Sequence, residues 1–115
     1  MAVKKFEDLI VWQKAQDFSV LIYENFSDLK DYSFRDQITR ASVSISNNIA
    51  EGFDRRTNTD FTRFLYIAIS SNSEVRSMLY LSERLKYLKE NQSEELVEKS
   101  NEISRMLFGL IQSMK

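Results

Sequence analysis

The sequence predicts an all-α protein: an elongated four-helix bundle in which each helix runs antiparallel to the one before it. The chain of 115 residues contains no Pro and only two Gly, although turns and barrels use both residues and helix interiors exclude both. Apolar residues recur at three- and four-residue spacing through most of the chain, which is the period of one helical face. The length is typical of one domain, so we expect a single up-down-up-down bundle across residues 1–115.

The first two expected helices cover about residues 7–27 and 34–51, and each has one apolar face. In the first helix that face consists of Val11, Ala15, Phe18 and Ile22. The second helix is expected to begin at Ser33, which with Asp36 has the spacing of an N-cap and an acidic third residue. Gly52 is expected just past its C-terminus, a position that favours glycine.

The third expected helix, at about residues 59–88, is the longest, and a fourth at about 93–114 completes the bundle. Thr57 and Asp60 have the spacing of a second capping arrangement. A helix over 59–88 would extend roughly 45 Å at 1.5 Å per residue, which favours an elongated molecule. Three residues beside its apolar stripe widen the buried face: Leu65, Asn72 and Leu79. The helix is therefore expected to contact two other helices.

The composition argues against an enzyme. The chain has no His and no Cys, so it lacks the commonest general base, the commonest transition-metal ligand and the most reactive nucleophile. The di-iron sites of some four-helix bundles need Glu-x-x-His motifs, which are absent here. Two isolated glycines, Gly52 and Gly109, cannot form a glycine-rich phosphate loop. We therefore predict a non-catalytic protein with no cofactor and no metal site.

The sequence also shows no sign of a membrane or secretory protein. No stretch approaches the roughly 20 consecutive apolar residues that a membrane span requires. The N-terminus continues into Phe6-Glu7-Asp8 instead of an apolar signal core. We expect a cytoplasmic protein with no membrane partner and no small-molecule substrate.

The second expected helix carries a polar stripe beside its apolar face, consisting of Gln37, Arg40, Ser44, Asn48 and Glu51. Polar groups at the edge of a core need partners, because each one left unsatisfied costs on the order of 1–3 kcal/mol. Three hypotheses explain this stripe. The first is a structural network that sets helix register, and the second is a subunit interface. The third is an active site built from Arg40, Ser44 and Glu51.

Arg55 and Arg56 follow the second expected helix and Arg63 lies one turn into the third, so we expect three guanidinium groups at one end of the bundle. Such a cluster can bind phosphates. Two facts count against this interpretation. Carboxylates close in sequence can neutralise the arginines, and the isoelectric point of about 5.5 is below the range of dedicated nucleic-acid binders.

The net charge of -1 conceals an uneven distribution along the chain. Residues 55–89 contain seven basic and three acidic side chains, whereas residues 90–102 contain one basic and five acidic. This arrangement suits head-to-tail association or a local anionic partner, and it is also common on solvated helix faces.

The segment from Gln37 to Gly52, QITRASVSISNNIAEG, resembles the signature of the 23S rRNA-intervening-sequence protein family. Residues 6–15 and 61–74 resemble the first and third helices of that family, so the resemblance covers nearly the whole chain. The chain departs from the family pattern at Thr39, where a basic residue is usual, and at Ser70, where Gly is usual. The change at Thr39 weakens the case that the second helix itself holds nucleic acid.

The resemblance implies a four-helix bundle that assembles as a homopentameric barrel, similar to the accessory proteins of diversity-generating retroelements. It also implies RNA or another nucleic acid as the partner. We therefore expect an oligomeric scaffold that binds nucleic acid through Arg55, Arg56 and Arg63. The alternative is a structural or protein–protein interaction module that binds no nucleic acid.

Overall fold

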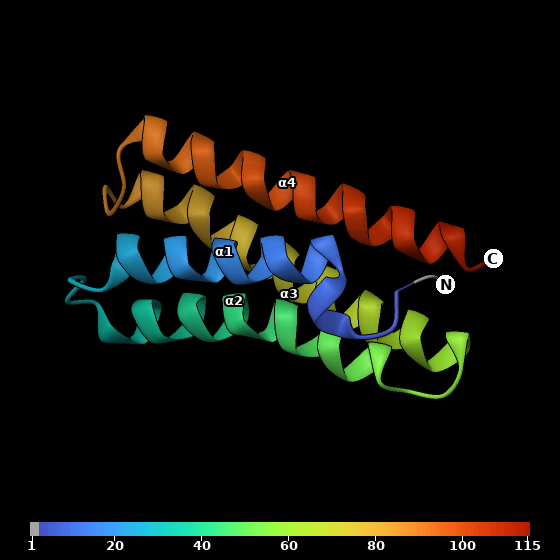
Figure 1. Cartoon of the computed structure of the whole chain (residues 1–115). Helices are drawn as coiled ribbons and strands as arrows, with labels where there is room; N and C mark the ends of the chain where they lie inside the picture. Colours follow the sequence, from blue (N-terminus) through green and yellow to red (C-terminus); the bar gives the residue numbers. More distant parts are fainter. Residues whose placement is uncertain (1–2) are drawn as a thin grey trace.

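The computed structural model describes residues 3–115, which form four long α-helices with short connections (Figure 1). One turn of 3₁₀-helix precedes them, and the elements are η1 (Phe6–Asp8), α1 (Ile10–Phe26), α2 (Tyr32–Phe53), α3 (Asn58–Arg84) and α4 (Glu90–Ser113). Successive helices run antiparallel, and the molecule measures 43 × 22 × 20 Å. The predicted elongated up-down-up-down bundle is confirmed.

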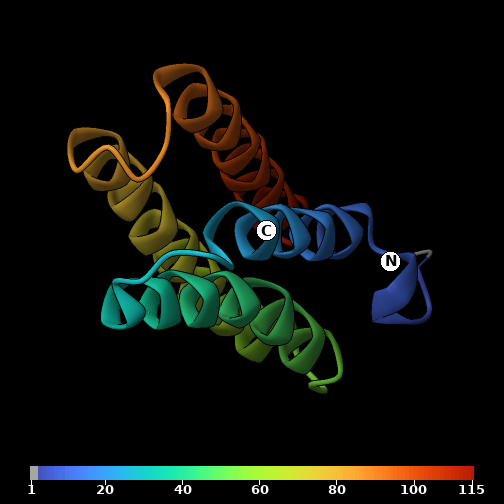
Figure 2. The same cartoon turned by 90° about the vertical axis from the view of Figure 1, so that its left-hand side faces the viewer.

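The four helices pack in cyclic order around one apolar core. α3 contacts α2 on one side and α4 on the other, while α1 contacts α2 and, over fewer residues, α4 (Figure 2). Burying one large apolar side chain contributes roughly 1.5–3 kcal/mol. The core side chains that are at most 1% exposed include Phe18, Ile22, Ile38, Ile45, Ile49, Leu65, Val75, Leu79, Ile103 and Leu107. Leu65 and Leu79 confirm that α3 faces two neighbours at once.

The first helix is divided, and the prediction of one helix over 7–27 is wrong at its N-terminal end. Leu9 has extended backbone angles, φ -72° and ψ 122°, and separates η1 from α1. Its side chain is buried in the core, which holds the break in place. The Gln13 side chain crosses the break and donates a hydrogen bond to the Glu7 carbonyl oxygen at 2.9 Å.

α2 is longer than the predicted 34–51 at both ends. Asp31 is its N-cap: Oδ1 accepts a hydrogen bond from the Phe34 amide at 3.2 Å. Ser33 is therefore inside the helix, and the prediction that it caps α2 is wrong. Gly52 also lies inside the helix and does not follow it, so its expected role as a C-terminal residue is wrong as well.

α3 begins as predicted but ends earlier than residue 88. The Thr57 side chain accepts a hydrogen bond from the Asp60 amide at 3.1 Å, which confirms the predicted cap. Lys86 has φ 64°, the left-handed conformation that ends many helices. The Tyr87 amide then donates to the Ser82 carbonyl at 2.8 Å. α4 begins at Glu90, three residues before the predicted start at 93.

None of the helices within residues 3–115 is both long enough and apolar enough to cross a membrane.

Candidate nucleic-acid interface

The polar stripe of α2 lies along the seam between α2 and α3. Gln37 Nε2 donates to Glu74 Oε2 at 3.2 Å, and two turns further on the Ser44 and Ser71 hydroxyls lie 2.9 Å apart. Asn48 Nδ2 donates to the Ser44 carbonyl at 2.8 Å and to its hydroxyl at 3.0 Å. These bonds link α2 to α3 at two levels, which is the geometry of a network that sets the register of two helices.

Arg40 and Glu51, the charged members of the stripe, are exposed and stand apart from this network. Eleven residues separate them on one helix, a rise of roughly 16 Å at 1.5 Å per residue. The structure therefore does not bring Arg40, Ser44 and Glu51 to one point. Arg40 instead borders a groove toward α1 that is lined by Tyr23, Asp36, Thr39, Arg40 and Val43.

Arg55, Arg56 and Arg63 lie at the end of the bundle where α2 connects to α3. Arg55 Cζ is 4.7 Å from the centre of the Phe64 ring, and Arg63 Cζ is 4.8 Å from the same centre. A cation–π contact at an exposed site contributes about 0.5–1 kcal/mol. The structure thus gathers Arg55 and Arg63 around one aromatic ring, while Arg56 is exposed in the connection.

Gly52 allows Phe64 to reach this position. A Cβ added to Gly52 would lie 2.6 Å from Phe64 Cβ and 3.0 Å from Phe61 Cδ1, closer than atoms can pack without a shift. Phe61 also packs edge-to-face on Phe53, with ring centres 5.7 Å apart. The absence of a side chain at Gly52 lets α2 and α3 meet tightly just below the arginines.

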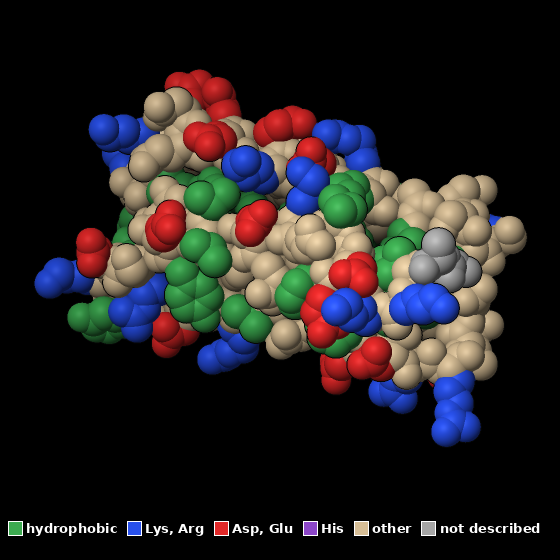
Figure 3. Space-filling model, in the orientation of Figure 1, with side chains coloured by type: hydrophobic (Ala, Val, Ile, Leu, Met, Phe, Trp, Pro, Cys, Tyr) green, Lys and Arg blue, Asp and Glu red, His purple; other side chains and the backbone are tan. Residues whose placement is uncertain are grey.

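The arginines have few acidic neighbours in ion-pair range. Within residues 3–115, one ion pair involves them: Arg63 Nη2 lies 3.8 Å from Asp60 Oδ1. Both side chains are about half exposed, and such pairs contribute only about 0–1 kcal/mol. In Figure 3 the right-hand end of the molecule, which holds the α2–α3 connection and the N-terminal segment, shows Lys and Arg side chains, with Asp and Glu side chains beside them toward the middle.

The basic stretch at 55–89 does not form one surface. α3 runs the length of the bundle, so its basic side chains are spread along that length, with Arg76 between the two ends (Figure 1). Arg84, Lys86 and Lys89 lie at the α3–α4 connection, roughly 40 Å of helix from Arg55. The local cluster at the α2–α3 end therefore consists of Arg55, Arg56 and Arg63.

A second polar network, which the sequence did not reveal, joins α3 to α4. The Ser100 hydroxyl donates to Asn72 Oδ1 at 2.9 Å, and Asn72 Nδ2 donates to the Ser100 carbonyl and the Ser104 hydroxyl, both at 2.9 Å. Arg76 Nη1 donates to the same Ser104 hydroxyl at 3.3 Å. Asn72 and Ser100 are 0% exposed, so these bonds satisfy groups that no water reaches.

The family model for 23S rRNA-intervening sequence proteins matches residues 7–109. The chain belongs to this family. A solved structure of a protein of unknown function from the S23 ribosomal protein family of Bacteroides thetaiotaomicron VPI-5482 has 30% sequence identity and a TM-score of 0.83. The similarity covers 89% of this chain and 98% of that one. No curated protein matches the sequence.

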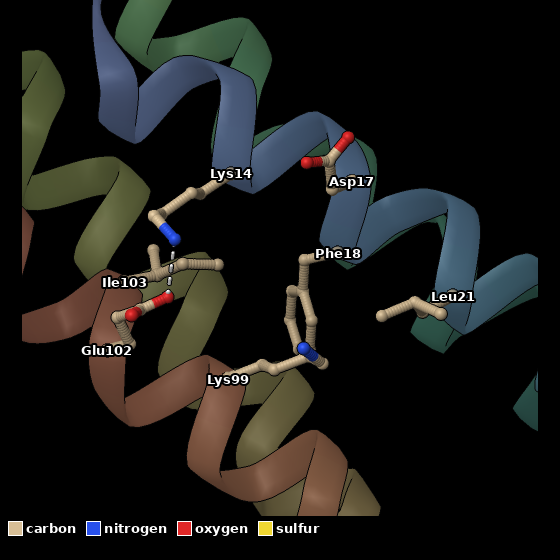
Figure 4. A pocket seen from close by; sticks show the side chains of 7 residues that line it. All are labelled: Lys14, Asp17, Phe18, Leu21, Lys99, Glu102 and Ile103. Carbon is tan, nitrogen blue, oxygen red and sulfur yellow. Dashed lines mark ion pairs between the residues drawn. The ribbon is translucent and has the colours of Figure 1, made fainter.

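In this 23S rRNA-intervening sequence family member, the space between α1 and α4 is small. A cavity of about 80 Å³ lies there, lined by Lys14, Asp17, Phe18, Leu21, Lys99, Glu102 and Ile103 (Figure 4). Lys14 Nζ reaches across it to Glu102 Oε1 at 3.2 Å. The cavity has room for a few water molecules and is smaller than the roughly 300–1,000 Å³ of most ligand pockets.

Proposed function

We propose that the chain is a non-catalytic, oligomeric scaffold that binds RNA or another nucleic acid through Arg55, Arg56 and Arg63. The observation that carries the proposal is the pair of guanidinium groups held over the Phe64 ring. Arginine suits this task because its planar guanidinium binds phosphate through two parallel hydrogen bonds. Contact with the ring also restricts both side chains before binding, which lowers the entropy lost when a phosphate arrives.

The non-catalytic part of the proposal is supported by the polar stripe. Its central members bond to one another and to α3, and its charged members are separated by about three turns of helix. An acid–base or nucleophilic site needs its groups within hydrogen-bond reach of the same substrate atoms.

The nucleic-acid proposal is tested by measuring the affinity for a structured RNA at several salt concentrations. Three phosphate contacts predict a slope of log K against log salt of roughly -2 to -3. Replacing Arg55, Arg56 and Arg63 by Gln should remove most of this slope and weaken binding. The control replaces Arg84, Lys86 and Lys89 by Gln, which removes the same charge at the other end of the bundle. Equal losses in both variants would contradict the assigned surface.

The oligomeric part of the proposal places the subunit contact along the α2–α3 seam. Ile67 and Leu81 recur on one face of α3, and Leu85, its C-cap residue, continues the row; they are 40%, 45% and 45% exposed. Glu74 lies on the same face and bonds to Gln37 of the stripe. An apolar row with a polar border is typical of self-association surfaces, and the family resemblance favours a homopentamer.

Light scattering tests this contact. The chain should have several times its mass of 13.6 kDa. Leu81→Glu should shift the mass toward one subunit, because it puts a charge into the apolar row, whereas Tyr80→Glu, a neighbour 55% exposed on another side of α3, should not. A mass of one subunit for the unaltered chain would contradict the oligomer.

The same apolar row favours the alternative function, a structural or protein–protein interaction module. That function predicts assembly without salt-dependent RNA binding. The affinity measurement above separates the two proposals.

A further inference from the structure

Two exposed aromatic rings, one from α3 and one from α4, pack together near the end of the bundle that holds the α2–α3 connection. Tyr66 of α3 and Phe108 of α4 are 46% and 50% exposed, and they pack edge-to-face with ring centres 6.5 Å apart and planes at 74°. A single exposed apolar side chain needs no explanation. Two large aromatic rings from different helices meet at the surface here, each about half exposed, and we call this pair the platform.

The platform lies close to one of the arginines, Arg63. Tyr66 lies three residues after Arg63 on α3, so the two side chains are neighbours on one helical face. Arg63, with a side chain 59% exposed, contacts the Phe64 ring that Arg55 also contacts. Phe64 and Tyr66 are two residues apart on α3, so the ring that carries Arg55 and the Tyr66–Phe108 pair lie on different sides of this helix.

The surface around Phe108 has space for a flat ligand. The next residue on α4 is Gly109, where an added Cβ would meet nothing within 4 Å. The nearest basic side chain on α4, Arg105, is ion-paired with Glu98, with Nη2 3.2 Å from Oε1. The surface next to the rings is open, and the positive charge closest to Tyr66 along α3 is that of Arg63, three residues earlier.

We infer that Tyr66 and Phe108 form a stacking platform for unpaired bases, so that this end of the bundle selects single-stranded over double-stranded nucleic acid. The inference rests on the proposed function and adds the class of nucleic acid. Arginines along a backbone combined with aromatic rings under the bases are the usual chemistry of single-strand binding. A duplex cannot use the rings, because its bases are already stacked and paired, whereas both forms present phosphates to Arg55 and Arg63.

The test compares a 12-nucleotide unstructured RNA with a 12-base-pair duplex containing the same strand. The unaltered protein should bind the single strand more tightly. Tyr66→Leu should weaken single-strand binding roughly 5- to 150-fold and leave duplex binding unchanged, because one stacked base is lost and no charge is removed. Tyr66→Phe should retain the affinity, since it keeps the ring.

Tyr80→Leu is the matched control. Tyr80 is also on α3 and 55% exposed, but it lies 14 residues from Tyr66, roughly 21 Å along the helix. Equal single-strand affinity of the Tyr66→Leu and Tyr80→Leu variants would overturn the platform, as would equal binding of single strand and duplex; either result leaves the arginine surface standing. Absence of binding to both RNAs at low salt would overturn the proposed function itself.

Discussion

Gly52 of α2 lies directly against Phe64 of α3, so closely that a Cβ on the glycine would be 2.6 Å from Phe64 Cβ. Phe64 in turn carries Arg55 and Arg63 on its ring. The glycine therefore determines both how tightly two helices pack and where the arginine cluster stands.

Gly52→Ala should destabilise the protein by about 1–3 kcal/mol, because a methyl group forced into this contact shifts a buried aromatic residue. The measurement is the free energy of unfolding from urea titration. Gly109→Ala is the matched control, since Gly109 also lies inside a helix but has open space around it. It should stabilise the protein by up to about 1 kcal/mol through higher helix propensity. A stabilising Gly52→Ala would show that the contact is looser than described.

Asn72→Ala should destabilise the protein by roughly 2–4 kcal/mol. The change creates a cavity and removes the partner of the buried Ser100 hydroxyl and carbonyl. Asn48→Ala, which removes a half-buried amide bonded within its own helix, should cost about 1 kcal/mol or less. Chemical denaturation measures the free energy of unfolding of both variants. A smaller loss of stability for Asn72→Ala than for Asn48→Ala would contradict the importance of the α3–α4 network.

Asp31→Ala should destabilise the protein by about 0.5–2 kcal/mol, because Asp31 caps the α2 N-terminus and also accepts a hydrogen bond from Tyr87 Oη. Ser33→Ala should change the unfolding free energy by no more than about 0.5 kcal/mol, since Ser33 is exposed and inside the helix. Thermal unfolding of the two variants distinguishes the two candidate caps. A larger destabilisation by Ser33→Ala than by Asp31→Ala would instead identify Ser33 as the cap.

Tyr87 is expected to make the free energy of unfolding depend on pH in the alkaline range. The hydrogen bond that its Oη donates to Asp31 Oδ2 at 2.7 Å raises the pKa of Tyr87 above its ordinary value of 10.0, and burial and the charge of Asp31 act in the same direction. A group with a raised folded-state pKa contributes stability that is present below its unfolded pKa and is lost as the pH rises through the folded pKa.

Tyr87→Phe removes this contribution. The difference in unfolding free energy between the unaltered protein and Tyr87→Phe should be constant up to about pH 10 and should fall above it. Urea titrations between about pH 8 and about pH 12 measure the difference. A difference that stays constant across that range would show that the bond to Asp31 has no effect on Tyr87.

The interiors of the helices could be predicted from the sequence, and several of their ends could not. Apolar spacing located the buried faces because each face repeats every three or four residues. The ends depend on competing residues a short distance apart. Asp31 and Ser33 are both good caps, and Lys86 adopts a positive φ without being glycine, which no local pattern indicates.

The place of the arginines at one end of the bundle was predictable from the sequence, but their contacts were not. Sequence spacing indicated that Arg55 and Arg63 lie near one end of the bundle, but not that both contact Phe64. Asn72 was expected at the edge of the buried arc, and its partners lie 28 and 32 residues away on α4. Pairings over such distances depend on how helices align, which periodicity within one helix does not specify.

The antiparallel order of the four helices also determines where a tag or a dye can be attached to the protein. The C-terminus lies at the same end of the bundle as the α2–α3 connection (Figure 1). An affinity tag or fluorescent fusion at the C-terminus would therefore lie at the end proposed to bind nucleic acid. The chain has no native cysteine, so a single cysteine introduced at the exposed Lys86 would carry a dye at the far end of the bundle.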